Sequence, residues 1–188
     1  MKPHMTKNEA SLFFSFITHS SNYVEFGCGG STFIAAHYVK NSIVSVESSL
    51  KWIGTTKREC SQARIQPNFF HADIGEIGEW GTPINDLEIN KWPSYHNDVW
   101  GIKGTWGADL YFIDGRFRVA CFAQIYRRAD AQSIIGIHDF LSREKHYGVI
   151  RDLGREIASA DDLSFFVPIP DRMRRSTEII EEYRFNHR

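Results

Sequence analysis

The amino-acid sequence predicts an α/β protein with a doubly wound, mostly parallel sheet of seven strands that ends in an antiparallel strand pair. Three observations carry this prediction. Short apolar runs alternate with helix-like segments through most of the chain. A glycine-rich turn follows the first run, which is typical of a strand that leads directly into a helix. Only a short turn separates the last two runs, and a short turn permits only an antiparallel connection.

The individual elements follow from local patterns. Thr6 and Glu9 have the spacing of a capping box, and apolar residues recur after them at helical intervals, so residues 6–19 are expected to form a helix. Runs rich in β-branched and aromatic residues are expected to be strands. The expected strands are 23–26, 43–47, 68–72, 108–113, 133–137, 163–168 and 177–185, and further helices are expected at 31–38, 50–63, 117–129 and 147–159.

A single domain is expected to cover residues 1–188, with residues 1–20 as its N-terminal helix. Residues 74–107 interrupt the alternation and hold six glycines, two prolines and four of the five tryptophans. Segments of this length without regular structure are uncommon in compact domains and are usually functional. We therefore expect a long, partly ordered excursion here.

Bulk composition excludes several classes of protein. Hydrophobic residues make up 42% of the chain, charged residues 24%, and the formal net charge is −1. This balance gives no electrostatic basis for binding nucleic acid or an anionic membrane. The three cysteines lack C-x-x-C spacing and support neither a disulfide framework nor a zinc site. No apolar run approaches the roughly 18 residues of a membrane span, and no signal-peptide pattern opens the chain, so a cytoplasmic location is expected.

Polar residues and glycines follow the ends of successive predicted strands. Ligands bind at the carboxyl ends of the strands in open α/β sheets, so these residues are the candidates for a site. After the first strand come Gly27, Gly29 and Gly30, which let a ligand lie against the backbone. A dinucleotide site needs a third glycine where Thr32 stands, and Glu25 would repel a pyrophosphate. Both departures disfavour an NAD-dependent oxidoreductase.

The pattern E-x-G-x-G-G-S-T at residues 25–32 is similar to the first motif of class I S-adenosylmethionine-dependent methyltransferases. The resemblance spans about residues 20–140 and implies a Rossmann-like core with S-adenosylmethionine as cofactor. It implies that Glu47 binds the ribose, because a carboxylate can accept hydrogen bonds from both ribose hydroxyls, and that Asp73 contacts the adenine. Taken singly, Glu47 also fits a surface residue and Asp73 a helix cap. The rest of the implied cofactor set is Glu25, Gly27, Cys28, Gly29, Gly30, Ser31 and Asp114.

The ends of the fourth and fifth strands look like the I-D-G and H-D signatures of a small-molecule O-methyltransferase branch. Some relatives there bind a divalent cation, and Asp114 and Asp139 offer oxygen ligands for one such as Mg²⁺. The competing interpretation makes His138 a general base, with a pKa near neutrality. A third interpretation is purely structural: Asp114 caps a helix, and His138 is hydrogen-bonded within its loop. Phe140 stands where the metal-dependent pattern has another acid or amide.

Two further groups of residues are candidates for binding the methyl acceptor. Arg116 and Arg118 could bind a carboxylate or phosphate of the substrate, or lie on a solvated helix turn. The aromatic residues of the excursion could form a lid or acceptor pocket, or instead cover the sheet edge or make a homodimer contact. Those proposed to line the acceptor pocket are Trp92, Tyr95 and His96.

The sequence therefore predicts a methyltransferase that modifies oxygen of a small-molecule or glycan-like acceptor. Alignment of nucleophile, methyl carbon and sulfur supplies much of such catalysis, so a sparse set of ionisable groups is no contradiction. The alternative is a catalytically silent protein that binds S-adenosylmethionine or S-adenosylhomocysteine. No nucleic-acid or membrane partner is expected.

Overall fold

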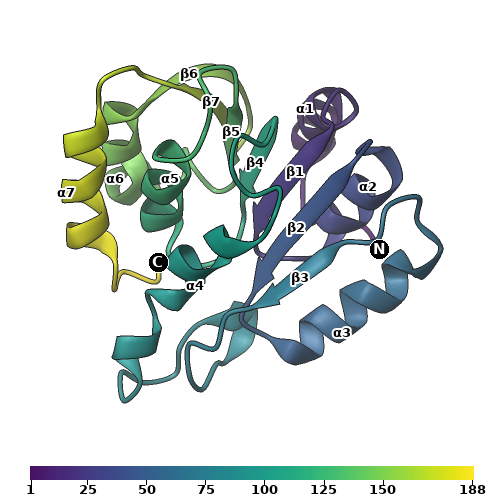
Figure 1. The fold of residues 1–188 in the computed structure, drawn as a ribbon, viewed down its shortest axis with the longest axis horizontal. Helices are drawn as coiled ribbons and strands as arrows, with labels where there is room; N and C mark the ends of the chain where they lie inside the picture. Colours follow the sequence, from purple (N-terminus) through teal and green to yellow (C-terminus); the bar gives the residue numbers. More distant parts are fainter.

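The computed structural model describes all residues 1–188 and contains one seven-stranded sheet flanked by helices (Figure 1). The strand order is β3-β2-β1-β4-β5-β7-β6. Strands β1 to β5 pair in parallel, and β7 runs antiparallel to both of its neighbours. The strands are β1 (Asn22–Phe26), β2 (Ser42–Glu47), β3 (Asn68–His71), β4 (Leu110–Ile113), β5 (Ile134–Ile137), β6 (Gly154–Ala160) and β7 (Leu163–Pro168).

Helices cover both faces of this sheet, as the alternating pattern predicts. Figure 1 shows α1 to α3 on one side and α4 to α7 on the other. They are α1 (Lys7–Ile17), α2 (Gly30–Tyr38), α3 (Leu50–Glu59), α4 (Ser94–Asn97), α5 (Arg118–Tyr126), α6 (Glu144–Tyr147) and α7 (Met173–Tyr183). The predicted capping box of α1 is present, with Thr6 and Glu9 bonding each other's backbone N–H. None of the helices combines the length and hydropathy needed to span a bilayer.

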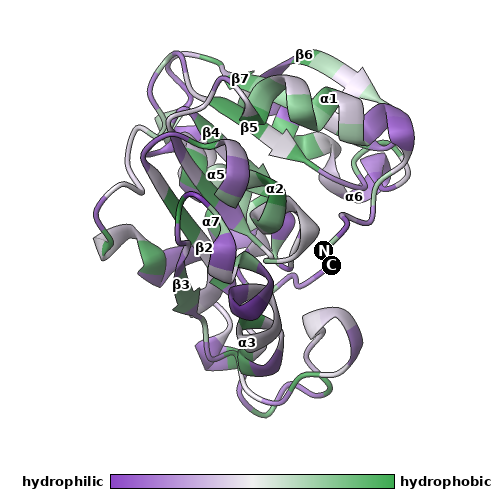
Figure 2. Cartoon of the chain, turned by 90° about the vertical axis from the view of Figure 1, so that its right-hand side faces the viewer, coloured by the Kyte–Doolittle hydropathy of each residue, from purple (hydrophilic) through white to green (hydrophobic).

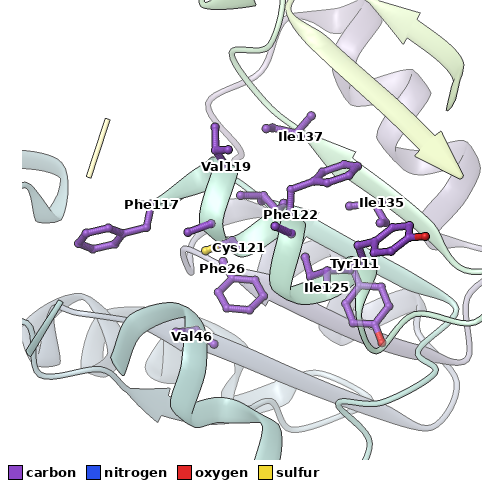
Figure 3. Close-up of a cluster of buried hydrophobic side chains, with 14 of the residues drawn as sticks. Phe26, Val46, Tyr111, Phe117, Val119, Cys121, Phe122, Ile125, Ile135 and Ile137 are labelled. Carbon is purple, nitrogen blue, oxygen red and sulfur yellow. The ribbon is translucent and has the colours of Figure 1, made fainter. Parts of the chain in front are cut away.

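Two hydrophobic clusters fill the space between the sheet and its helix layers. Successive residues of a strand point to opposite faces, so Tyr23 of β1 joins the cluster under α1 and α2, while Val24 and Phe26 join the cluster under α5. In Figure 3 the side chains of α5 pack beside Phe26 and the residues of β4 and β5. Hydropathy colouring follows this division, with the strands mainly hydrophobic and the outer turns hydrophilic (Figure 2).

The C-terminal elements differ from the prediction in two places. The helix expected at 147–159 is wrong, because residues 154–160 form β6, the edge strand that pairs with β7. Its Arg, Glu and Ala content favours a helix locally, but pairing with a neighbouring strand decides its conformation. The strand expected at 177–185 is also wrong: residues 177–183 lie in α7, whose Ile179 is fully buried against the α5 side. The antiparallel pair is thus β6 and β7.

The excursion of residues 74–107 is ordered as a chain of short helical turns between β3 and β4. It contains α4 and the 3₁₀ turns Glu79–Gly81, Ile89–Lys91 and Asp98–Gly101. Its aromatic residues divide into two groups. Trp92, Tyr95 and Trp100 are buried in the cluster under α5, whereas Trp80 and Trp106 are exposed. Residues 92–105 therefore cover the sheet where a longer helix would otherwise lie, whereas none of residues 75–91 is buried.

Candidate functional site

The polar residues predicted at the strand ends meet at one edge of the sheet. Backbone hydrogen bonds tie each loop to its neighbouring strand: Gly27 N–H donates to Val46 O at 2.8 Å, and Asp114 N–H donates to Phe26 O at 2.9 Å. The same arrangement continues to β5, where His138 N–H donates to Ile113 O at 3.0 Å. The glycine loop and the ends of β2, β4 and β5 are therefore held in a fixed relationship.

The three loop glycines serve different purposes. Gly27 has φ +99°, and a Cβ there would lie 2.6 Å from the backbone nitrogen of Gly115. A Cβ on Gly30 would lie 2.2 Å from the nitrogen of Pro3. Both glycines are therefore required by contacts within the protein. Around Gly29 an added Cβ would meet only the ring of Trp52, at 3.6 and 3.8 Å, so this is the glycine with room for a ligand.

Glu25 and Ser31 support the loop from inside the protein. The Glu25 carboxylate has no exposed surface and accepts hydrogen bonds from the hydroxyls of Tyr23, Ser31, Thr32 and Ser45, two on each oxygen. Four donors use the full acceptor capacity of a carboxylate, so none remains for a ligand. Burial raises the pKa of Glu25 to about 7, against the opposing effect of its hydroxyl donors. Sequence reasoning placed this acid against the cofactor; the structure places it beneath the first turn of α2.

Glu47 lies at the end of β2 and faces the glycine loop. Its Oε2 accepts a hydrogen bond from Cys28 N–H at 3.2 Å. Its Oε1 accepts bonds from the backbone N–H groups of Ser48 at 2.7 Å and Ser49 at 2.9 Å. Because Oε2 has one donor, it keeps acceptor capacity for a ligand hydroxyl. The thiol of Cys28 is buried beside Thr56, and burial raises its pKa, so this residue contributes through its backbone.

Asp73 lies beyond β3 at the rim of an open hollow of about 570 Å³. Its carboxylate accepts Gly75 N–H at 3.0 Å and pairs with Lys91 Nζ at 3.0 Å, and these contacts lower its pKa. The bond to Gly75 closes a local turn, but no helix begins there, so Asp73 is not a helix cap. Both Asp73 and Lys91 are substantially exposed, so the pair is easily opened by a ligand.

The acids of β4 and β5 form a compact group with His138. Its Nδ1 lies 3.1 Å from Asp114 Oδ1 and 3.5 Å from Asp139 Oδ1, and its Nε2 lies 3.4 Å from Oε2 of Glu9 on α1. Burial lowers the pKa of His138, but the hydrogen bond and charge of Asp114, with the charges of Asp139 and Glu9, outweigh it. The net effect raises the pKa to about 9, so the imidazole carries a proton at neutral pH.

Arg118 and Arg143 complete this group. The buried guanidinium of Arg118 lies 3.0 Å from Asp139 Oδ2 and 3.5 Å from Asp114 Oδ1, and it also donates to the carbonyls of Gly115 and His138. Arg143 pairs with Asp139 at 3.1 Å. Three carboxylates thus face three cations. We call Glu9, Asp114, His138, Asp139, Arg118 and Arg143 the ion network.

The ion network bears on the predicted metal site. One ligand atom each from Asp114, His138 and Asp139 lies within 4.8 Å of the others, which is close enough for a shared cation. Metal binding, however, needs a deprotonated imidazole and free carboxylate oxygens. Here Arg118 already contacts both carboxylates, and Arg143 contacts the same oxygen of Asp139. The donor set does not fit a divalent cation as it is arranged.

The remaining predicted acceptor residues fall into two groups. Arg118 is engaged in the ion network, whereas Arg116 is half-buried and has no carboxylate partner. The side chains of Tyr95 and His96 are buried, and burial lowers the pKa of His96 to about 4. Trp92 is buried too and packs edge-on against His187 near the C-terminus. These aromatic residues belong mainly to the core.

Sequence reasoning missed two participants, Glu9 and Arg143. The sequence pattern identified Glu9 only as the N3 residue of the capping box, and the structure shows that it has this role as well. Arg143 follows Asp139 at the helical spacing of an ion pair, which is a weak signal in a region without helical periodicity. Neither position lies at a strand end.

Comparison with solved structures places this architecture. A methyltransferase-like protein from Silicibacter pomeroyi superimposes with a TM-score of 0.84 at 26% identity, covering 98% of this chain and 97% of that one. The chain has the fold of the class I S-adenosylmethionine-dependent methyltransferases. No protein-family model and no curated protein matches the sequence.

Two more distant methyltransferase structures share the fold. An O-methyltransferase from Bacillus cereus in complex with S-adenosylhomocysteine has a TM-score of 0.59 at 13% identity, with 88% of this chain and 84% of that chain covered. An O-methyltransferase of tomaymycin synthesis from Streptomyces achromogenes, in complex with S-adenosylmethionine, has a TM-score of 0.58 at 11% identity, with 87% and 81% covered. The methyltransferase fold thus extends over nearly the whole chain.

Proposed function

We propose that this protein is an S-adenosylmethionine-dependent methyltransferase that acts on oxygen of a small-molecule acceptor. The observation that carries the cofactor assignment is the position of Glu47, whose Oε2 faces the glycine loop with acceptor capacity to spare. Gly29, the loop residue with room beside it, lies next to Cys28, the donor to that oxygen. The methyltransferases that share the fold, two of them described with cofactor or product bound, support the same assignment.

The residues of this chain would contribute binding and orientation. Glu47 would hold the ribose hydroxyls, and the backbone at Gly29 would approach the methionine part of the cofactor. S-adenosylmethionine supplies an activated methyl group when it is bound, so catalysis depends on holding the acceptor oxygen in line with it. His138 is protonated at neutral pH and its partners are acids, so we assign it a positioning role, not that of a general base.

We further propose that transfer proceeds without a divalent cation. Arg118 supports this, because its guanidinium contacts both carboxylates that would coordinate the ion. An arginine there supplies fixed positive charge and holds the ends of β4 and β5 together. It does not lower the pKa of an acceptor hydroxyl as a bound metal does. Acceptors that are already acidic, such as phenols or carboxylates, would therefore be the best substrates.

A catalytically silent cofactor-binding protein is the second candidate, and the protonated His138 favours it. Production of S-adenosylhomocysteine, measured by mass spectrometry across a panel of phenols, carboxylates and sugars, separates the two. Turnover above the protein-free control with any acceptor establishes an enzyme. Cofactor binding without turnover across the whole panel would instead favour the silent protein.

A further inference from the structure

Three arginines lie near the carboxyl ends of β4 and β5, and two of them are neutralised by acids. Arg118 pairs with Asp114 and Asp139, and Arg143 pairs with Asp139 at 3.1 Å. Arg116 makes no ion pair, although it is separated from Arg118 by one residue. The protein therefore leaves one guanidinium at this edge without a counter-charge.

The surroundings of Arg116 hold its side chain in place without satisfying it. Its backbone N–H donates to the Tyr95 hydroxyl at 3.4 Å, and its Nη1 lies 3.5 Å from the Thr82 hydroxyl. Its Nε is buried and has no hydrogen-bond partner. A guanidinium offers five donors in a fixed fork, and buried donors in native proteins are nearly always paired. Within the chain, this half-buried guanidinium therefore has one long hydrogen bond, to Thr82, and no counter-charge.

Arg116 lies beside the glycine loop of the proposed cofactor site. Gly115, which precedes it, packs so closely on the glycine loop that an added Cβ would lie 3.0 Å from Gly27. Arg116 thus lies at the point where the glycine loop contacts the end of β4. On its other side lies the C-terminal segment: burial first, and then the charge of Arg116, lower the pKa of His187. The positive charge of Arg116 therefore acts on His187. No carboxylate of the chain lies within ion-pairing distance of the Arg116 guanidinium.

We propose that Arg116 binds the carboxylate group of a ligand at the end of β4, beside the glycine loop. A planar guanidinium matches a carboxylate with two parallel hydrogen bonds, and such a ligand would supply the missing counter-charge. This inference rests on the proposed function, which offers two sources of that chemistry: the methionine carboxylate of the cofactor, or a carboxylate of the acceptor.

Calorimetry on three variants and two nucleoside probes distinguishes these sources. Arg116→Gln removes the charge, Arg116→Lys keeps the charge but loses the fork, and Arg64→Gln removes an exposed arginine elsewhere as the matched control. S-adenosylhomocysteine carries the carboxylate, and methylthioadenosine lacks it. If the cofactor is the source, Arg116→Gln weakens S-adenosylhomocysteine at least tenfold and leaves methylthioadenosine unchanged, with Arg116→Lys intermediate.

Benzoate tests the acceptor as the source. If the acceptor supplies the carboxylate, Arg116→Gln leaves S-adenosylhomocysteine affinity unchanged but abolishes the binding of benzoate, measured with and without S-adenosylhomocysteine. In the unaltered protein, the arginine Nε–H resonance missing from the Arg116→Gln spectrum should shift on ligand addition. This readout does not depend on the stability of a variant.

The contrary results are equally definite. The assignment is overturned if Arg116→Gln and Arg64→Gln behave alike with every probe, if the variant weakens methylthioadenosine as much as S-adenosylhomocysteine, or if the Nε–H resonance of Arg116 never moves. Failure of the unaltered protein to bind S-adenosylhomocysteine, with benzoate binding that still depends on Arg116, would remove the proposed function and keep the carboxylate site. Failure to bind either probe would remove both.

Discussion

The guanidinium of Arg118 lies 3.0 Å from the carboxylate of Asp139, in the position from which it also reaches the end of β4. The side chain of Arg118 is almost completely buried, whereas Arg143, which pairs with the same carboxylate, is partly exposed. Buried and exposed ion pairs respond very differently to the loss of one partner. The ion network can therefore be tested through stability, independently of any acceptor.

Arg118→Met should destabilise the protein by about 2 kcal/mol, because it removes a buried guanidinium from two half-buried carboxylates and leaves them only His138 and Arg143 as cationic partners. Arg143→Met, the matched control, should cost at most about 1 kcal/mol, since an exposed pair is screened by solvent. Chemical denaturation measures both. Millimolar Mg²⁺ should leave the stability of the unaltered protein unchanged. A Mg²⁺-dependent increase in its stability, or activity lost in chelator and restored by the ion, would contradict the metal-free account.

The pH dependence of stability should carry a contribution from Glu25. Its folded-state pKa, about 7, lies above its unfolded value of 4.5, so the unfolded chain releases this proton at lower pH than the folded protein does. The sign follows: this carboxyl makes folding less favourable as pH rises from about 4.5 to about 7, by on the order of 3 kcal/mol, with no further effect above that window. Glu25→Gln should flatten the profile there. An unchanged slope between pH 5 and 7 would rule out the protonated, buried carboxyl.

Gly27→Ala and Gly29→Ala should separate structural from ligand-binding glycines. At Gly27 a Cβ meets backbone atoms of Gly115 at 2.6 Å in a left-handed conformation, so alanine should cost at least about 2 kcal/mol of stability. At Gly29 a Cβ makes only ordinary contacts with Trp52, so stability should change by less than about 1 kcal/mol while cofactor affinity falls. Denaturation and calorimetry on the pair provide the test. Equal losses of stability would remove the distinction.

The parallel half of the fold was predictable because its signals are local. A few consecutive residues are enough to recognise the glycine turn after β1, the capping box of Thr6 and Glu9, and the apolar strands. The C-terminal part was not, because β6 is an edge strand whose conformation comes from pairing with β7 across a turn at Asp161. Its sequence has helix-forming residues, so long-range pairing overrides local preference.

The site was predictable as a location but not as a set of partnerships. Topology alone brings Glu47, Asp114 and His138 to one edge of the sheet. Topology does not show that four hydroxyls occupy all the acceptor positions of the Glu25 carboxylate. Nor does it show that Arg118 lies between the acids that follow β4 and β5. With Glu25 turned inward, its charge no longer weighs against an NAD cofactor, so the departure at Thr32 and the fold comparison carry that exclusion.

The loop at Gly29 and the carboxylate of Glu47 form the proposed S-adenosylmethionine site. The most direct measurement is calorimetric titration of S-adenosylhomocysteine into the unaltered protein and into Glu47→Gln, with Glu181→Gln on the surface of α7 as control. We expect saturable binding by the unaltered protein and the control, and an affinity at least tenfold weaker in Glu47→Gln. No binding to the unaltered protein at millimolar ligand, or equal binding by all three, would contradict it.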